Sequence, residues 1–237
     1  MKTLLRIKDL WVDYSGVVAV SDVSFHVTED ASVCMIGPNG AGKTTILNTI
    51  CGLKSASRGE IWFQDERIIG MAAHEIAKLG IALVPEGSRG FTQMTVRENL
   101  EMGAYLCNNS KTLAMNFERI YALFPRLKER EGQAAGTLSG GERQMLKVSC
   151  ALMHNPSLIL FDEPTQGLSP LMRKELAKRI TEMNRQGAHF LLVEQDAYFA
   201  MKLTQNGYLL ENGRISIEGN TEDLLNQDRI RQGYLEV

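Results

Sequence analysis

The sequence contains no long hydrophobic run and almost no excess of charge of either sign. Its 237 residues include 26 Lys and Arg against 28 Asp and Glu, a formal net charge of −2. No apolar run approaches the roughly 18 residues that a membrane-spanning helix needs, so no such helix is predicted. Because there is no basic excess, no nucleic-acid partner is expected. The charged first eight residues are too short for a signal peptide.

Cysteine is also scarce, and repeats are absent. The four cysteines form no Cys-x-x-Cys pair and have no metal-ligand spacing, and most of them lie among apolar residues. They are therefore predicted to be buried, reduced thiols. There is no internal repeat and no low-complexity linker. Together these absences predict one substantial domain in the cytoplasm. The cysteines are Cys34, Cys51, Cys107 and Cys150.

Residues 37–44, Gly-Pro-Asn-Gly-Ala-Gly-Lys-Thr, match the phosphate-binding pattern Gly-x-x-x-x-Gly-Lys-Ser/Thr. A mostly apolar run at 31–36 predicts a buried strand before them, and residues 44–47 open a helix after them. In this context glycines let the backbone approach an anion, and amides at the helix start point at it. Lys43 is predicted to neutralise the β- and γ-phosphates of a nucleotide, and the Thr44 hydroxyl to ligate Mg²⁺. The predicted nucleotide-binding residues here are Gly37, Pro38, Asn39, Gly40, Ala41, Gly42, Lys43, Thr44 and Thr45.

Two acidic residues follow the apolar run at 158–161, which is predicted to be a buried strand. Open α/β sheets bind ligands at the carboxyl ends of their strands. Asp162 is therefore predicted to hold Mg²⁺, and Glu163 to orient and polarise an attacking water. Acidic residues at strand ends are common, so this assignment depends on the phosphate-binding pattern upstream.

Residues 139–142, Ser-Gly-Gly-Glu, match a capping box, in which Ser139 and Glu142 satisfy free amides at a helix start. The helix would present its positive end outward, and the two glycines would leave that end open to a phosphate. Such a site, distant from the phosphate-binding loop, is understandable if it meets the γ-phosphate bound by a partner subunit. Taken alone, these residues favour the interpretation as an ordinary capped helix that follows a glycine-containing loop.

Strand-like and helix-like segments alternate along the chain, which predicts an α/β core with parallel strands. An Asn212-Gly213 pair between strand-like flanks is typical of a hairpin. Residues 95–98, Thr-Val-Arg-Glu, match another capping box at a helix start. The predicted elements include antiparallel strands in 4–27, strands at 158–161 and 190–193, a hairpin in 208–218, helices in 95–131 and after Ser139, and a closing helix at 221–233.

Residues 138–144, Leu-Ser-Gly-Gly-Glu-Arg-Gln, resemble the signature of the ABC-type ATPases. Together with the phosphate-binding loop and the further segments named below, the resemblance to this family extends over essentially the whole chain. It implies an α/β fold: a P-loop NTPase core with an antiparallel β subdomain and an inserted helical subdomain. One ABC-type ATPase domain would span 1–237. Its nucleotide-binding core would take 1–94 and 151–237, and its helical subdomain 95–150. The resemblance implies ATP and Mg²⁺ as cofactors.

The resemblance adds three positions. Tyr14 occupies the place of an aromatic ring that stacks on adenine. Glu86 replaces a glutamine that senses Mg²⁺, and its carboxylate can still ligate the ion. Gln195 replaces a histidine at the γ-phosphate, and it can donate a hydrogen bond but cannot take a proton near neutral pH. The implied roles are catalytic for Glu163, Lys43 and Gln195, metal-binding for Thr44, Glu86 and Asp162, and contact with a partner's ATP for Ser139, Gly140, Gly141 and Glu142.

Several segments resemble one subgroup, the ATP-binding subunit of bacterial branched-chain amino-acid uptake systems: residues 84–87, 94–100, 123–130 and 193–195. This resemblance implies an ATP-hydrolysing importer subunit, peripheral on the cytoplasmic face of the inner membrane. Its partners would be a second ABC ATPase subunit, related or identical, and integral membrane permease subunits, with a periplasmic solute-binding protein acting indirectly. The permease would dock near residues 86–97 and the helical subdomain.

Three alternatives remain open at this stage. Gln195 leaves room for a weakly catalytic or non-catalytic ATP-binding partner, although Glu163 argues against it. The substrate could instead be urea or a short amide, because similar ATPases serve those importers. A soluble ABC ATPase of translation or DNA repair would carry tandem cassettes or a long coiled-coil insertion, and this sequence has neither.

Overall fold

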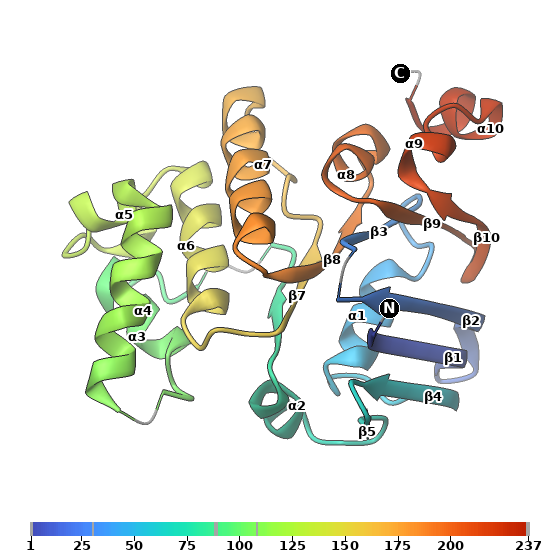
Figure 1. The fold of residues 1–237 in the computed structure, drawn as a ribbon, viewed down its shortest axis with the longest axis horizontal. Helices are drawn as coiled ribbons and strands as arrows, with labels where there is room; N and C mark the ends of the chain where they lie inside the picture. Colours follow the sequence, from blue (N-terminus) through green and yellow to red (C-terminus); the bar gives the residue numbers. More distant parts are fainter. Residues whose placement is uncertain (1, 30, 88–89, 108, 236–237) are drawn as a thin grey trace.

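The computed structural model describes residues 2–29, 31–87, 90–107 and 109–235. Within that part of the chain the strands form a four-stranded and a six-stranded sheet (Figure 1). The smaller sheet has the order β2-β1-β4-β5 and consists of β1 Thr3–Tyr14, β2 Val17–Thr28, β4 Arg58–Phe63 and β5 Glu66–Arg67. The larger sheet has the order β10-β9-β3-β8-β7-β6 and consists of β3 Val33–Ile36, β6 Ile81–Val84, β7 Leu158–Asp162, β8 His189–Glu194, β9 Asn206–Glu211 and β10 Arg214–Asn220.

The smaller sheet is antiparallel, as the sequence predicts for its first two strands. Along β2 the buried residues Val23, Phe25 and Val27 alternate with exposed polar residues, so one face of the strand packs on the core. Ser15 and Gly16 form the turn between β1 and β2, with φ of 51° and 92°. These strands are longer than the sequence pattern suggests, at 12 residues each.

The larger sheet has a parallel centre. Strands β3, β8, β7 and β6 pair in parallel, and β9 also runs parallel to β3. Every residue of β3 and of β7 is buried, which is the pattern of strands covered on both faces. Because these strands share one direction, their carboxyl ends meet at one edge, where Asp162 is paired with Val193 and Ile36 with Glu194. This edge positions the candidate site.

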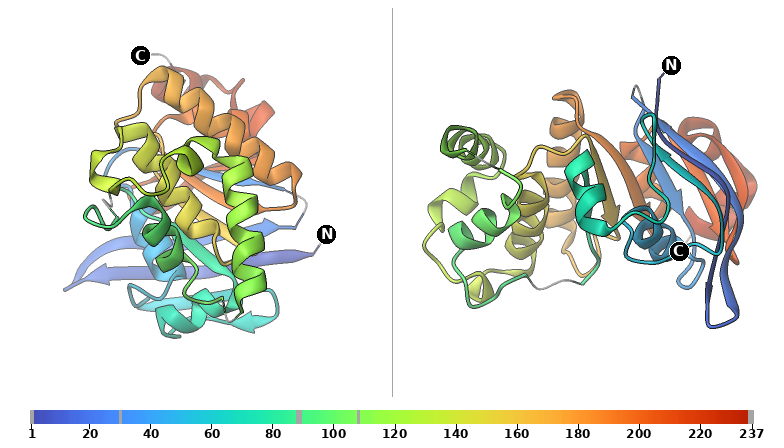
Figure 2. Two further views of the ribbon diagram at one scale, coloured as in Figure 1. Left: turned by 90° about the vertical axis from the view of Figure 1, so that its left-hand side faces the viewer. Right: turned by 90° about the horizontal axis from the view of Figure 1, so that it is seen from below.

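In the part of the chain that the structure describes, four α-helices gather at one end of the molecule, opposite the antiparallel sheet (Figures 1 and 2). They are α3 Val96–Gly103, α4 Ser110–Leu123, α5 Pro125–Glu129 and α6 Gly140–Leu152. Both predicted capping boxes are present: the amide of Glu98 donates to Thr95 Oγ1, and that of Glu142 to Ser139 Oγ. The division of the chain at residues 95 and 150 stays a prediction. The other helices described before residue 221 are α1 Lys43–Ile50, α2 Ala73–Leu79, η1 Ala135–Thr137, α7 Pro170–Arg185 and α8 Ala197–Leu203.

The prediction of a single closing helix at residues 221–233 is wrong. The structure has three short pieces instead: α9 Thr221–Leu224, α10 Asp228–Ile230 and a π-helical turn, η2, Arg231–Leu235. Leu224 and Ile230 are both buried. On one continuous helix, residues six apart point about 120° away from each other. The break therefore lets both side chains reach the core. Among the described residues no helix combines the length and apolar character needed to cross a bilayer.

His154, just beyond α6, is expected to make the stability of the fold depend on pH. Burial lowers the pKa of its imidazole, the Gly103 backbone offsets part of this, and the charge of Arg119 lowers it further. The unfolded chain binds this proton near pH 6.5, so the contribution to stability is complete above that pH and is lost as the pH falls. We expect His154→Gln to lose less thermal stability than the wild type between about pH 7 and pH 5.

Calorimetric melting of the two proteins checks this expectation. Burial is the largest cause that raises the pKa values of Asp162 and Glu194 to about 6. These two carboxyls therefore stabilise the folded state as the pH falls, which opposes the effect of His154. The wild type must for this reason be compared with the variant. These carboxyls are common to both proteins, so the difference between the two profiles isolates His154. Parallel profiles would contradict the assignment.

Candidate functional site

The loop between β3 and α1 is shaped to receive an anion. A Cβ atom on Gly37 would lie 2.2 Å from the Leu210 carbonyl oxygen, and one on Gly42, at φ 107°, would lie 2.8 Å from the Ala19 oxygen. Gly40, at φ 79°, faces open space. Helix α1 begins at Lys43 with no side-chain cap, so its first amides and positive end remain available to a ligand. Of the other loop residues, Pro38 and Asn39 are exposed, Ala41 is buried and Thr45 is half-buried.

Lys43 is buried at the centre of the site, with 3% of its side chain exposed. Its Nζ donates to the carbonyl oxygens of Gly37 and Pro38 at 2.8 and 3.1 Å. It also forms an ion pair with Glu163 Oε1 at 3.1 Å. The structure therefore joins the predicted phosphate-binding lysine to the predicted catalytic carboxylate, and a phosphate that binds Lys43 would compete with Glu163 for the same charge.

A second contact joins the loop to the end of β7. Thr44 Oγ1 donates to Asp162 Oδ1 at 3.0 Å. The pKa of Asp162 is raised to about 6: burial is the largest cause, the charges of Glu86 and Glu163 add to it, and the hydrogen bond from Thr44 opposes it. Glu86 itself is exposed. A buried carboxylate crowded by negative charge is stabilised by a cation, and paired hydroxyl and carboxylate oxygens suit a hard one such as Mg²⁺.

The protein itself offers few side chains that could ligate a metal ion at this site. Across the described ranges, no three His, Cys, Asp or Glu side chains gather as a metal cluster. A cation held by Thr44 and Asp162 would therefore need oxygens from water or from a bound phosphate to complete its coordination. Mg²⁺ in nucleotide sites is usually held in this way.

Glu163 is held in an unusual backbone conformation. Its φ is 44°, in the left-handed region that non-glycine residues rarely adopt. Such a conformation costs about 1–3 kcal/mol and persists where the surrounding structure enforces it, which is common at functional sites. Here the Glu163 amide donates to the Val193 carbonyl at 2.9 Å, and the carboxylate is 8% exposed beside Lys43.

Glu194 is a further residue of this site, and the sequence analysis missed it. It is buried at the end of β8, where its two oxygens accept from the amides of Thr165 and Gln195 at 3.0 and 3.2 Å. It thereby fixes the backbone of Gln195, whose side chain is exposed. The signal that could have found it is an acidic residue at the end of a buried strand, the same signal that identified Asp162.

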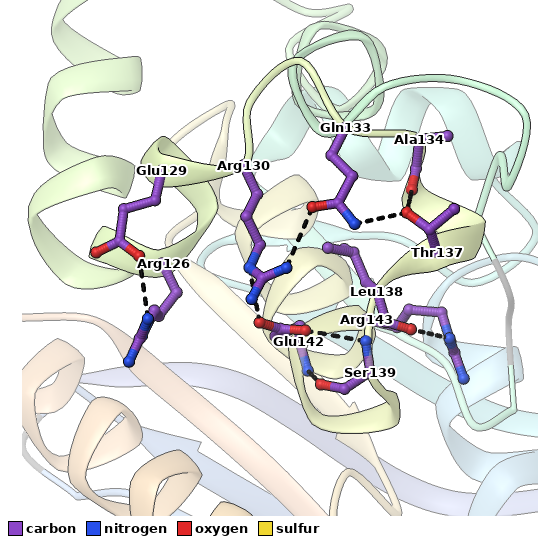
Figure 3. Close-up of polar contacts among 10 residues, drawn as sticks. All are labelled: Arg126, Glu129, Arg130, Gln133, Ala134, Thr137, Leu138, Ser139, Glu142 and Arg143. Atoms are coloured by element: carbon purple, nitrogen blue, oxygen red, sulfur yellow. Dashed lines mark hydrogen bonds and ion pairs between the residues drawn. The ribbon is translucent and has the colours of Figure 1, made fainter.

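The signature segment forms a capped and exposed helix start (Figure 3). The Ser139 amide donates to Glu142 Oε2 at 2.9 Å, and Arg130 Nε pairs with Glu142 Oε1 at the same distance. Gly140 is exposed and a Cβ there would meet nothing, whereas a Cβ on Gly141 would lie 2.4 Å from Met172 Cε. The segment lies away from α1 within this chain (Figure 1). Its contact with a partner's ATP stays a prediction.

Tyr14, at the end of β1, is 46% exposed and so is not a core residue. Lys54 Nζ lies 4.0 Å from the centre of its ring, a cation–π distance. An exposed aromatic ring of this kind can stack on a base. No contact in the structure tests the predicted role with adenine.

The fold and this site define an ATP-binding cassette ATPase. The family model described as ABC transporter matches residues 20–166, and the chain belongs to this family. The predicted fold class is thereby confirmed, and ATP is the nucleotide. A crystal structure of an ABC transporter's ATP-binding cassette in its ADP conformation superposes with a TM-score of 0.88, at 25% identity and full coverage of both chains. A nucleotide-free cassette gives 0.87 at 25% identity, covering 99% of this chain and 100% of that one.

Relatives of known name show which ABC transporter ATPases this chain resembles in sequence. The chain is 42% identical to the high-affinity branched-chain amino acid transport ATP-binding protein BraG of Pseudomonas aeruginosa, over 94% of this chain and 95% of that protein. It is 33% identical to the probable branched-chain amino acid transport ATP-binding protein LivF of Archaeoglobus fulgidus, over 97% of each. The lipopolysaccharide export ATP-binding protein LptB of Haemophilus influenzae is 31% identical, over 98% and 97%.

Proposed function

We propose that this chain is the ATP-hydrolysing subunit of an importer for branched-chain amino acids. The observation that carries the proposal is the 42% identity to BraG over 94% of the chain. The set of acidic and basic residues at the sheet edge supports hydrolysis, because Lys43, Asp162 and Glu163 are all present and adjacent. Urea and short amides are the alternative solutes.

Three residues would act in hydrolysis. Lys43 would bind the β- and γ-phosphates and leave its ion pair with Glu163. The freed Glu163 carboxylate would then orient and polarise the water that attacks the γ-phosphorus. Gln195 would donate a hydrogen bond near the γ-phosphate without exchanging a proton. Catalysis of this kind depends on positioning and on stabilising charge.

The remaining nucleotide contacts follow from the same geometry. The amides of residues 37–45 would surround the phosphates, and the exposed ring of Tyr14 would stack on adenine. Thr44 and Asp162 would hold Mg²⁺, with the charge of Glu86 nearby. The ion would supply positive charge that neutralises the phosphate oxygens.

We further propose that each ATP is shared with a second ABC ATPase subunit. The exposed helix start at Ser139, Gly140, Gly141 and Glu142 would contact the γ-phosphate held by that partner. Membrane permease subunits would dock near residues 86–97 and the helical end. Of that region, Ser88 and Arg89 lie outside the described residues. The complex would lie on the cytoplasmic face of the inner membrane and receive solute from a periplasmic binding protein.

Reconstitution in vesicles tests the proposal. The chain, its second cassette and the permease would be placed in proteoliposomes with the binding protein, and ATP-driven entry of labelled leucine and labelled urea would be compared. Entry of leucine that requires ATP supports the proposal, and entry of urea alone would reassign the solute. ATP binding without hydrolysis in every combination would instead indicate a non-catalytic partner, with Gln195 as the first position to examine.

A further inference from the structure

The β9–β10 hairpin packs against the backbone of the phosphate-binding loop. The carbonyl oxygen of Leu210 leaves no room for a side chain at Gly37, since a Cβ there would approach it to 2.2 Å. At the hairpin turn, the Gly213 amide donates to the Ala41 carbonyl at 2.9 Å. The position of the loop backbone is therefore tied to residues 210–213.

Glu211, one of the two residues between these contacts, is tied to the end of the described chain. Its two carboxylate oxygens accept from Tyr234 Oη at 2.9 Å and from Arg229 Nη2 at 2.6 Å. The hydrogen bonds from Ser216 and Tyr234, together with Arg229, hold the pKa of Glu211 below its usual range despite partial burial. The carboxylate is therefore ionised at neutral pH and both bonds are charge-assisted.

Tyr234 also lies beside the part of the site that contains Glu163 and Gln195. It is half-buried, packs on the core and lines a cavity of about 410 Å³ together with Glu163, Thr165 and Gln195. The η2 turn that carries it packs against α8. Helix α8 begins two residues after Gln195 and is capped by Asp196, whose Oδ1 accepts from the Phe199 amide. The turn that carries Tyr234 therefore packs on the helix that follows Gln195, and Tyr234 and Gln195 line the same cavity.

We propose that Glu211, Arg229 and Tyr234 form a clamp that positions Gln195 relative to the phosphate-binding loop, with Tyr234 as a positioning residue for ATP hydrolysis. The inference rests on the proposed role of Gln195 in this site. Glu194 holds the Gln195 amide on one side, and α8 begins two residues later on the other, so the support of α8 bears on where the exposed Gln195 side chain lies. Glu211 lies on the β9–β10 hairpin, which supports the phosphate-binding loop, and it also binds Tyr234 on the η2 turn, which packs against α8.

Tyr234→Phe tests the clamp, since it removes one hydroxyl and keeps the ring. We expect kcat for ATP to fall about three- to tenfold, as the loss of one hydrogen bond allows, with KM changed less than about twofold. Arg229→Gln, which removes the other bond to Glu211, should lower kcat in the same direction. Steady-state hydrolysis by the chain mixed with its second cassette gives both constants.

Tyr121→Phe is the matched control. Tyr121 Oη donates to Glu131 Oε2 at 3.0 Å, so this variant loses the same kind of bond at the helical end of the molecule. We expect its melting temperature to fall by an amount similar to that of Tyr234→Phe, with kcat unchanged. A kcat for Tyr234→Phe equal to that of Tyr121→Phe would overturn the clamp while leaving the proposed function intact.

A double-mutant cycle with Gln195→Ala separates positioning from general stability. If Tyr234 acts through Gln195, the hydroxyl should matter little once the Gln195 side chain is gone, so the two effects on kcat should not add. Additive effects would show that Tyr234 acts independently of Gln195 and would overturn the inference. A wild-type mixture that binds ATP without hydrolysing it would overturn the proposed function and this inference with it.

Discussion

Replacing Glu163 with glutamine is expected to abolish ATP turnover while ATP still binds. Glutamine keeps the size of the side chain but cannot polarise a water as a carboxylate does, and losses of about 10²–10⁴-fold are typical when such a group is removed. The substitution also removes the ion pair that occupies Lys43, whose Nζ lies 3.1 Å from Glu163 Oε1. Phosphate should therefore bind at least as well as before.

Two measurements check this result. Release of inorganic phosphate reports turnover, and gel filtration with ATP reports whether the variant accumulates as a closed dimer with its partner. Glu118→Gln, a change of the same kind at an exposed position of α4, serves as the control and should hydrolyse ATP at the wild-type rate. A normal rate in Glu163→Gln would remove this residue from the activation of water.

Lys43→Ala is expected to weaken ATP binding itself. A charge-assisted hydrogen bond contributes about 1.5–3 kcal/mol, so affinity should fall at least about tenfold. The variant also leaves the Glu163 carboxylate buried without its ion-pair partner. Breaking a buried pair in this way destabilises a protein by about 3–5 kcal/mol. Titration calorimetry and thermal melting measure the two effects separately.

A second variant distinguishes loss of binding from loss of fold. In Lys43→Ala/Glu163→Ala both members of the pair are gone, so part of the stability should return while ATP affinity stays low. Lys178→Ala, at an exposed position of α7, controls for removal of a surface lysine and should bind ATP normally. Unchanged ATP affinity in Lys43→Ala would contradict the assignment of the phosphate-binding loop.

Several of the predictions from sequence that the structure confirms concern contacts between near neighbours in the chain. The capping boxes at Thr95 and Ser139 need residues three positions apart, and both are present. The hairpin at Asn212-Gly213 needs two residues at positive φ, and they lie at 50° and 77°. In each case the residues themselves carry the conformational preference, so their order in the sequence is sufficient.

The features that the sequence analysis missed depend on distant neighbours. The closing helix breaks between Leu224 and Asp228 because Leu224 and Ile230 must both reach the core. Glu194 belongs to the site because the Thr165 amide, 29 residues away, points at its carboxylate. No local pattern distinguishes such an acidic strand end from any other.

The sequence by itself determined the phosphate-binding loop, the helix start at Ser139 and the family to which the chain belongs. Backbone amides and glycine conformations act within a few residues, so these features follow from local order. Only the tertiary structure decided that Thr44, 118 residues away, would donate to Asp162, that Lys43 would pair with Glu163, and that Tyr234 would reach the cavity beside Gln195. Those contacts arise because parallel strands that are distant in the chain end at one edge of a sheet, and strand order is set by packing of the whole core.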